Sequence, residues 1–235
     1  MRLLDLHGAP HASYTGYMTK LLLVIGHAKR DSLTHALADA YQAGAESQGV
    51  GSSRLELASL SFDLVLRSGH RGEQPLEPDL ARAQQALRDA KHVAWFFPTW
   101  WAAPPALVKG FIDRVLLPGF GYRYEPGRAP HRKLLGGRSA RLVTTMDAPW
   151  WWYALFYRSA LHASFIKATL RFVGFGPVKT LTGYGLRGTS RRRVAQRVAR
   201  LLERSRHAGA KDARALDRAA ARERFQAAAP TSRKP

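Results

Sequence analysis

Short apolar runs recur along this chain, and each is followed by a stretch with helical spacing. Residues 20–26 read Lys-Leu-Leu-Leu-Val-Ile-Gly, without polar alternation. A strand of this kind is typical of a parallel sheet that is covered on both faces. The same pattern, with more alternation in the second case, predicts strands at residues 55–60, 93–97, 140–145 and 178–184.

Between these strands, apolar residues return at every third or fourth position and predict amphipathic helices. Ser32 is suited to cap the first helix, which runs to about Gln48 before Gly49 and Gly51. Further helices are predicted over residues 79–90, 105–117, 151–173 and 191–204. Five strands alternating with helices predict a doubly wound α/β fold, with a five-stranded parallel sheet in the order 2-1-3-4-5 and helices on both faces.

The length of 235 residues suits one domain with appendages. We expect a flexible N-terminal extension over residues 1–18, the α/β domain over 19–206, and a disordered tail over 207–235. In that tail, Leu216 and Phe225 are the large apolar residues. No apolar run reaches the length of a membrane-spanning helix, and the first nineteen residues lack the pattern of a secretory signal, so we expect a cytoplasmic protein.

The charge is strongly positive, with 37 Lys and Arg against 17 Asp and Glu, a formal net charge of +20. Such an excess favours anionic partners in general, and the basic tail suits weak contact with anionic surfaces. No nucleic-acid motif accompanies the charge, so specific nucleic-acid binding is not expected. The chain has no cysteine, which excludes disulfides and thiolate chemistry, and its histidines show no metal-ligand spacing.

The loop after the first strand carries Gly26-His27-Ala28-Lys29-Arg30-Asp31-Ser32-Leu33-Thr34. It joins the end of a strand to the start of a helix, where free backbone N–H groups and the helix dipole favour an anion. A phosphate or pyrophosphate would suit it. The alternative is that Ser32 only caps the helix, a contribution of about 1 kcal/mol.

Residues 97–114 read Phe-Pro-Thr-Trp-Trp-Ala-Ala-Pro-Pro-Ala-Leu-Val-Lys-Gly-Phe-Ile-Asp-Arg. A buried strand here ends at Pro98, exposes Trp100 and Trp101, and continues into a helix. Ligands of open α/β sheets lie beyond the carboxyl ends of the strands, and flat aromatic rings at that place suit a flat aromatic cofactor. The alternative for this pair is plain core packing.

This run, with 22–34, 120–124, 144–147 and 174–178, closely resembles the flavin-dependent NAD(P)H:quinone reductase family, which has the flavodoxin-like fold. The resemblance covers about residues 19–186. It implies FMN or FAD as a tightly bound cofactor, NAD(P)H as co-substrate, a quinone or similar planar acceptor, and a homodimer. By the same resemblance, hydride would pass from the nicotinamide through the flavin to the acceptor.

The resemblance also implies roles for individual residues. The flavin phosphate would be held by His27, Ser32, Leu33 and Thr34. The edge of the ring would be lined by Pro98, Thr99, Trp100 and Trp101. The other side of the ring would meet Thr144, Thr145, Met146 and Asp147, where the family usually has Thr-Thr-Gly-Gly. The counterparts of the tyrosine and histidine that assist hydride transfer would be Tyr157 and His162.

Two interpretations remain open from the residues. The aromatic band at 150–157 fits core packing, a subunit interface or a slot above the flavin. A second function also fits the resemblance, because the family extends to a regulatory subunit of a potassium-efflux system. A basic tail would dock such a subunit against a membrane or an acidic partner.

Overall fold

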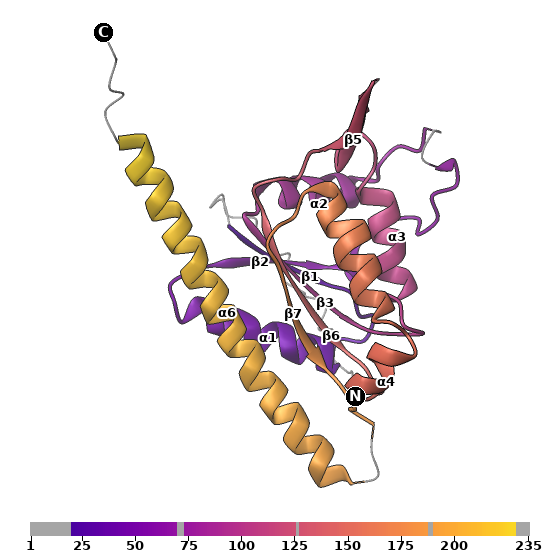
Figure 1. Ribbon diagram of the computed structural model, residues 1–235, viewed down its shortest axis with the longest axis vertical. Coiled ribbons are helices and arrows are strands. Elements are labelled where there is room, and N and C mark those ends of the chain that lie inside the picture. Colours follow the sequence, from indigo (N-terminus) through magenta and orange to yellow (C-terminus); the bar gives the residue numbers. More distant parts are fainter. Residues whose placement is uncertain (1–19, 70–72, 126, 188–189, 229–235) are drawn as a thin grey trace, which may run out of the picture.

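The computed structural model describes residues 20–69, 73–125, 127–187 and 190–228, and the expected N-terminal extension lies outside them. One sheet contains β1 (Leu21–Ile25), β2 (Ser52–Glu56), β3 (His92–Pro98), β6 (Ser139–Thr145) and β7 (Val178–Gly183). Its strands are all parallel and lie in the order β2-β1-β3-β6-β7 (Figure 1). Counted over this sheet alone, the predicted order 2-1-3-4-5 is confirmed.

Helices cover both faces of the sheet because the side chains of β1 alternate between them. Leu21, Leu23 and Ile25 pack with α1 (Leu33–Glu46) and with α6 (Arg191–Ala228). Leu22 and Val24 face the opposite cluster, with α2 (Pro78–Asp89) and α3 (Ala106–Val115). Burial on both faces explains why β1 is apolar at every position. Among the described residues, no helix is long and apolar enough to cross a membrane.

One short element differs from the sequence prediction. The second strand is Ser52–Glu56 and not 55–60, because β1 pairs Leu21 with Ser52 and ends where Ile25 pairs with Glu56. Leu57 is still buried, but in the short 3₁₀ helix η1 (Leu57–Ser59). The stretch around residues 120–124 leads into an antiparallel hairpin of β4 (Tyr122–Glu125) and β5 (Arg128–Lys133).

The long helix predicted over 151–173 is broken. It consists of α4 (Trp150–Leu155), a turn, the π-helix η3 (His162–Leu170) and α5 (Arg171–Val173), with Gly174 at φ 118°. In the turn, Arg158 and Ser159 have φ values of 45° and 53°, in the left-handed region. Two such residues in succession end a right-handed helix. The helical pattern carried no sign of this change of direction.

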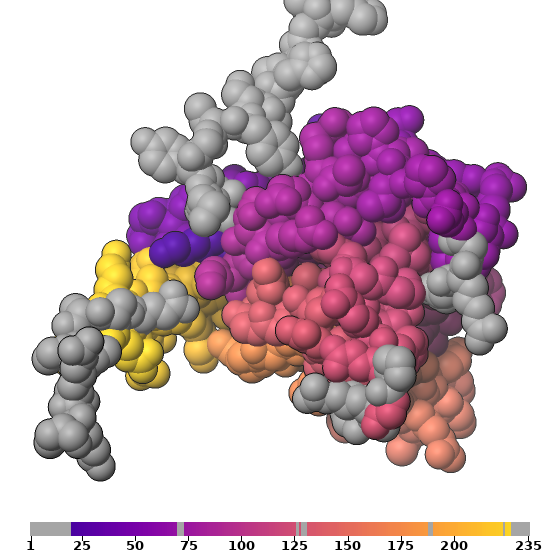
Figure 2. Space-filling view, turned by 90° about the horizontal axis from the view of Figure 1, so that it is seen from above, coloured from indigo at the N-terminus to yellow at the C-terminus, as the bar shows by residue number. Residues whose placement is uncertain are grey.

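The last helix is much longer than predicted. α6 has 38 residues, so residues 207–228 of the expected disordered tail are helical. Residues 229–235 of that tail lie outside the described ranges. In Figure 1, α6 crosses the molecule alongside α1, and in Figure 2 its yellow C-terminal part lies at one margin. A composition rich in alanine and arginine does form a helix here, because it packs against another helix.

Glycine allows the close approach of α1 and α6. A Cβ atom built on Gly44 would lie 1.9 Å from the Arg206 carbonyl oxygen, and one on Gly209 would lie 2.0 Å from the Tyr41 carbonyl oxygen. No real side chain tolerates those distances. Ser205 adds a hydrogen bond between the helices, since its hydroxyl donates to the Leu37 carbonyl at 2.8 Å.

A buried ionic cluster fixes the second half of α6 to the amino edge of the sheet, the edge at which the strands begin. Arg141 of β6 donates two hydrogen bonds to the Asp212 carboxylate, at 2.5 and 2.9 Å. Tyr41 donates to the same carboxylate at 2.9 Å, and His92 lies 3.4 Å away. Although burial opposes ionisation, the hydrogen bonds from His92 and Arg141 hold the pKa of Asp212 far below its ordinary value.

Candidate active site

Three connections meet at the opposite, carboxyl edge of the sheet. They follow β1, β3 and β6, as expected for a doubly wound fold. A cleft of about 290 Å³ opens beside two of them. It is lined by the end of β3 with the turn after it, by the end of β6 with the loop after it, and by three residues from further along: Pro98, Thr99, Trp100, Trp101, Ala102, Thr145, Met146, Asp147, Ala148, Tyr153, Tyr157 and Leu186.

The turn after β3 is tight and strained. Trp100 and Ala103 exchange two backbone hydrogen bonds, at 3.0 and 2.9 Å, across the two residues between them. Those two, Trp101 and Ala102, have φ values of 51° and 57°. A turn with both central residues at positive φ normally uses glycine or asparagine. Each other residue type held at such a φ value costs on the order of 1–3 kcal/mol. The Trp101 side chain is fully exposed as a result.

Hydroxyl and backbone contacts hold this turn to the loop after β6. Thr99 N–H donates to the Thr145 carbonyl at 2.8 Å, and the hydroxyls of Thr99 and Thr144 lie 2.9 Å apart. Thr144 is buried and is not part of the cleft lining, so it orients Thr99 from behind. Asp147 is exposed at the cleft, whereas Met146 is mostly buried beneath it.

The loop after β1 lies next to the tryptophan turn. The rings of His27 and Trp100 meet edge to face, with centroids 6.0 Å apart. His27 Nδ1 accepts a hydrogen bond from the Lys29 N–H at 3.0 Å, which closes the loop. The structure thus brings the predicted phosphate loop and the predicted ring edge to one place, although the loop itself does not line the cleft.

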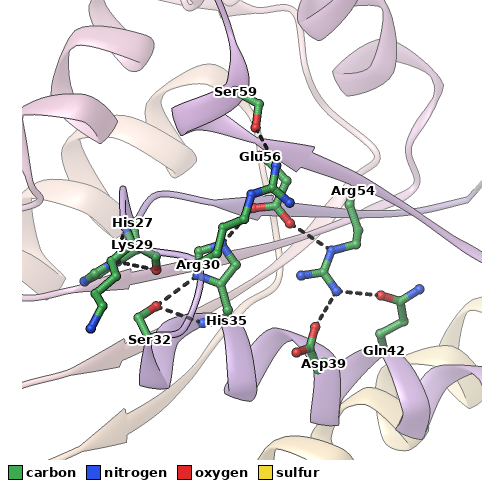
Figure 3. Close-up of polar contacts among 10 residues, drawn as sticks. All are labelled: His27, Lys29, Arg30, Ser32, His35, Asp39, Gln42, Arg54, Glu56 and Ser59. Atoms are coloured by element: carbon green, nitrogen blue, oxygen red, sulfur yellow. Dashed lines mark hydrogen bonds and ion pairs between the residues drawn. The ribbon is translucent and has the colours of Figure 1, made fainter. Parts of the chain in front are cut away.

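Ser32 caps α1, as the sequence predicted. Its hydroxyl accepts from the His35 N–H and also meets the His35 ring at 2.9 Å (Figure 3). The N–H groups of Leu33 and Thr34 lie in the first turn, where an α-helix supplies no acceptor. Thr34 is itself buried and Leu33 is half-buried. A ligand can therefore reach their backbone N–H groups more readily than their side chains. His35 was not singled out from the sequence.

The two predicted catalytic residues separate in the structure. Tyr157 lines the cleft and is about half exposed. His162 is not in the lining, and both its ring nitrogens are engaged, by the Tyr153 hydroxyl at 2.9 Å and by the Thr182 hydroxyl at 3.0 Å. Burial lowers the pKa of His162, which favours the neutral ring.

Tyr153 is the residue that connects His162 to the cleft; the sequence placed it in the aromatic band but gave it no catalytic role. It lines the cleft, and burial raises the pKa of its hydroxyl. The turn at 158–159 brings Tyr153 and His162 together, and an unbroken helix would not have done so at a spacing of nine residues. Only knowledge of that break could have indicated the pair.

The Lys-Gly-x-x-Asp-Arg part of the tryptophan motif has a structural role. Arg114 is fully buried, forms an ion pair with Glu77, and donates to the carbonyls of Asp63 and Pro75. Gly110 allows close contact, since a Cβ there would lie 2.7 Å from the Leu64 carbonyl oxygen. These two residues fasten the long connection after β2 against α3.

The aromatic band of α4 is exposed in the single chain, which rules out the core interpretation for most of it. The exposed fractions are 65% for Trp150, 46% for Trp151 and 61% for Phe156. Tyr153 is the buried member. Figure 1 places α4 at the end of the sheet toward which β6 and β7 point. This surface therefore adjoins the cleft.

The donors and rings at this edge fit a phosphorylated flavin. The N–H groups of Trp101 and Ala102 find no acceptor among the described residues, so they are free to meet the heteroatoms of a ring. Lys29 and Arg30 are exposed and add positive charge to the loop that would face the phosphate. The exposed indoles of Trp100 and Trp101 supply flat apolar surface.

The comparisons with known proteins agree with the observed fold. The sequence model of the flavodoxin-like fold matches residues 19–205. NAD(P)H dehydrogenase [quinone] 1 of Rattus norvegicus is 29% identical in an alignment of 125 residues that covers 45% of this chain and 46% of the rat protein. The chain spans about half the length of the curated relatives it matches first.

Two further relatives are matched over more of their length. The FMN-dependent NADH:quinone oxidoreductase of Ruegeria pomeroyi is 27% identical, over 68% of this chain and 86% of that protein. The structure of an NAD(P)H:quinone oxidoreductase from Methanothermobacter marburgensis superposes with a TM-score of 0.67 at 20% identity, covering 81% of this chain and 96% of that one.

Proposed function

Because this chain belongs to the flavodoxin-like fold family, we propose that it is a flavin-dependent NAD(P)H oxidoreductase that reduces a quinone or a similar planar acceptor. One observation carries the proposal: the tryptophan turn and the loop after β6 line a cleft at one edge of the sheet, and the phosphate loop lies beside that turn. The relatives named above are oxidoreductases, so the regulatory alternative gains no support from them.

The residues divide the binding task between two places. His27, Ser32 and the first turn of α1 would hold the phosphate, where N–H groups and positive charge coincide. The ring would be held by Thr99, by the tryptophan turn at residues 100–103 and by the loop at residues 145–147. A bound flavin supplies acceptance and delivery of hydride, while the protein sets its orientation and excludes side reactions. A phosphate site and a ring site of this kind suit both FMN and FAD.

Tyr153 and His162 are the proposed proton-holding pair. His162 Nδ1 lies 2.9 Å from the Tyr153 oxygen, so a neutral ring with its proton on Nε2 accepts the phenolic hydrogen. In that state Nε2–H donates to Thr182. The Tyr153 oxygen also accepts from the His162 backbone N–H at 3.3 Å, which fixes the position of the pair. Tyr157, at the mouth, is proposed to shape the acceptor site and not to move protons.

A homodimer is proposed as the active form. Beside the tryptophan turn, a groove of about 460 Å³ runs between α3 and η3, with Ala103, Ile112, Phe165 and Phe172 among its lining. This groove and the exposed aromatics of α4 provide apolar surface for a second subunit.

The test begins with the protein purified without added flavin. We expect a yellow protein that releases FMN or FAD on heating, bleaches anaerobically with NADH or NADPH, and regains colour on addition of a quinone. Trp100→Ala should weaken flavin binding, whereas Phe225→Ala, an exposed aromatic on α6, should not. A chain that neither carries nor binds FMN or FAD would contradict the proposal.

A further inference from the structure

Beside the proposed phosphate loop, hydrogen bonds connect the side chains of Ser32, His35 and Glu56 in a relay. The Ser32 hydroxyl oxygen lies 2.9 Å from His35 Nδ1, and His35 Nε2 lies 2.9 Å from the Glu56 carboxylate (Figure 3). His35 is 7% exposed, so its ring is held between these two groups. The relay connects the end of β2 to the residue that caps α1.

The carboxylate end of the relay is fixed by arginine. Arg54 Nε donates to the second oxygen of Glu56 at 3.0 Å, and its Nη1 reaches Asp39 and Gln42 on α1. Other groups near His35 are the His27 ring, at 6.4 Å between centroids, and Ser32 itself. Arg30 is directed to Ser59, and Lys29 pairs with Asp31 at the surface. Glu56 is therefore the charged group in direct contact with His35.

This geometry determines the tautomer of a neutral His35. Two acceptors cannot share a hydrogen bond, so Nε2 must carry a proton to meet the carboxylate. Nδ1 is then unprotonated and accepts the single hydrogen of the Ser32 hydroxyl. In that state Ser32 offers only lone pairs to its exposed side, and lone pairs repel a phosphate oxygen.

Protonation of His35 reverses the bond to Ser32. Both ring nitrogens then carry hydrogen, and Nδ1–H donates to the Ser32 oxygen. The hydroxyl hydrogen is released to the side on which an anion at the first turn of α1 would lie. The new positive charge on the ring also attracts that anion. One proton on His35 thus changes Ser32 from an acceptor to a donor.

We propose that His35 is a positioning residue that switches Ser32 between repelling and binding the phosphate of the flavin, so that the cofactor is held more tightly as the pH falls. This inference rests on the proposed flavin site and deepens it. His35 would act through Ser32 without touching the cofactor. Glu56 enforces the switch by forbidding the neutral tautomer that could donate to Ser32.

The experiment measures flavin binding and not turnover. Apoprotein is titrated with FMN and, separately, with riboflavin, which has the same ring without phosphate, from about pH 5.5 to 8.5. Quenching of flavin fluorescence gives each Kd. The phosphate of FMN has its own ionisation near pH 6, so each affinity is expressed relative to that of the Glu56→Gln variant, in which this ionisation is the same.

Glu56→Gln removes the constraint on the tautomer, because the amide N–H can donate to His35 Nε2 and leave Nδ1–H for Ser32. We expect this variant to keep high FMN affinity at high pH. Relative to it, the native chain should lose about tenfold in FMN affinity across the range, the effect of one hydrogen bond to a charged group. Riboflavin binding should show no such trend. His207→Gln, at an exposed position on α6, is the control and should match the native chain.

Three outcomes would overturn the switch: a constant FMN affinity ratio between native and Glu56→Gln chains, the same pH trend with riboflavin, or a trend that persists in Ser32→Ala. Circular dichroism and the urea midpoint verify that each variant is folded. If no variant binds FMN or FAD at any pH, the proposed function itself fails. If flavin binds without the pH trend, only the switch fails.

Discussion

The two edges of the sheet are built in opposite ways. At the amino edge, charges are buried and paired, and α6 is pressed against α1 at two glycines. At the carboxyl edge, non-glycine residues of the tryptophan turn hold positive φ, two backbone N–H groups of that turn lack acceptors among the described residues, and tryptophans are exposed. The first edge uses its polar groups for stability, whereas the second keeps them available for a ligand. Strain and unpaired donors at one edge are tolerable because helix packing and buried ion pairs at the other stabilise the fold.

The largest effect should come from removing the buried charge at the amino edge. Asp212→Asn leaves Arg141 buried without a countercharge, and the loss should be about 3–5 kcal/mol of unfolding free energy in urea. Flavin affinity of the folded fraction should stay the same, because the cleft lies at the other edge. A variant as stable as the native chain would show that α6 contributes little to this edge.

The same residue predicts how acid acts on the protein. The pKa of Asp212 is lowered in the folded state, so its stabilising contribution is present above the ordinary value of about 3.9 and is lost as the pH falls below it. Urea midpoints measured from about pH 5 downward should fall more steeply in the native chain than in Asp212→Asn. Parallel curves would contradict this assignment.

The next effect concerns the helix crossing. Gly209→Ala places a methyl group against the Tyr41 carbonyl, and α6 must move away from α1, at a cost of about 1–3 kcal/mol. Gly51→Ala is the matched control, because a Cβ there meets nothing within 4 Å. Thermal unfolding of both variants measures the difference. Equal transition temperatures would mean that α1 and α6 pack less closely at Gly209 than the structure shows.

At the carboxyl edge, a substitution should stabilise the protein. Ala102→Gly relieves the positive φ in the tryptophan turn and should raise the unfolding free energy by about 1 kcal/mol. Ala154→Gly, on the exposed face of α4, should lower it by a similar amount. If both variants lose stability, the turn is not strained.

The smallest expected effect belongs to His162. Because burial lowers its pKa, the unfolded chain binds more protons, so stability should decline as the pH falls through about 6.5. His162→Gln should remove this part of the slope between about pH 5 and 7. Chemical unfolding at fixed ionic strength measures the slope of the unfolding free energy against pH. An unchanged slope would mean that groups other than His162 take up the protons.

The sequence predicted those parts of the molecule that are governed by local patterns. Residues 20–26 are apolar throughout because both faces of β1 are covered, and the order of the sheet follows from alternating elements. Ser32 was predicted to cap α1, and Trp100 to lie in the connection after β3, because each stands where a strand leads into a helix. Each of these inferences needs only neighbours in the chain and a general rule of the fold.

What the sequence did not predict depends on distant partners. Asp212 is one acid in a basic stretch, and its importance appears only when Arg141, 71 residues earlier, lies beside it. The helical tail was missed because α1 supplies the surface that an alanine-rich helix lacks by itself. The roles of Tyr153 and His35 were missed for the same reason, since His162 and Glu56 reach them only through a turn and a neighbouring strand.

The position of Asp212 late in the chain has a consequence for biosynthesis. A ribosome that adds about 5–20 residues per second completes Arg141 roughly 4–14 s before it adds the acid that neutralises it. During that interval the nascent sheet carries an unpaired guanidinium on a surface that α6 later covers. Until α6 has emerged, this apolar surface and its charge stay uncovered.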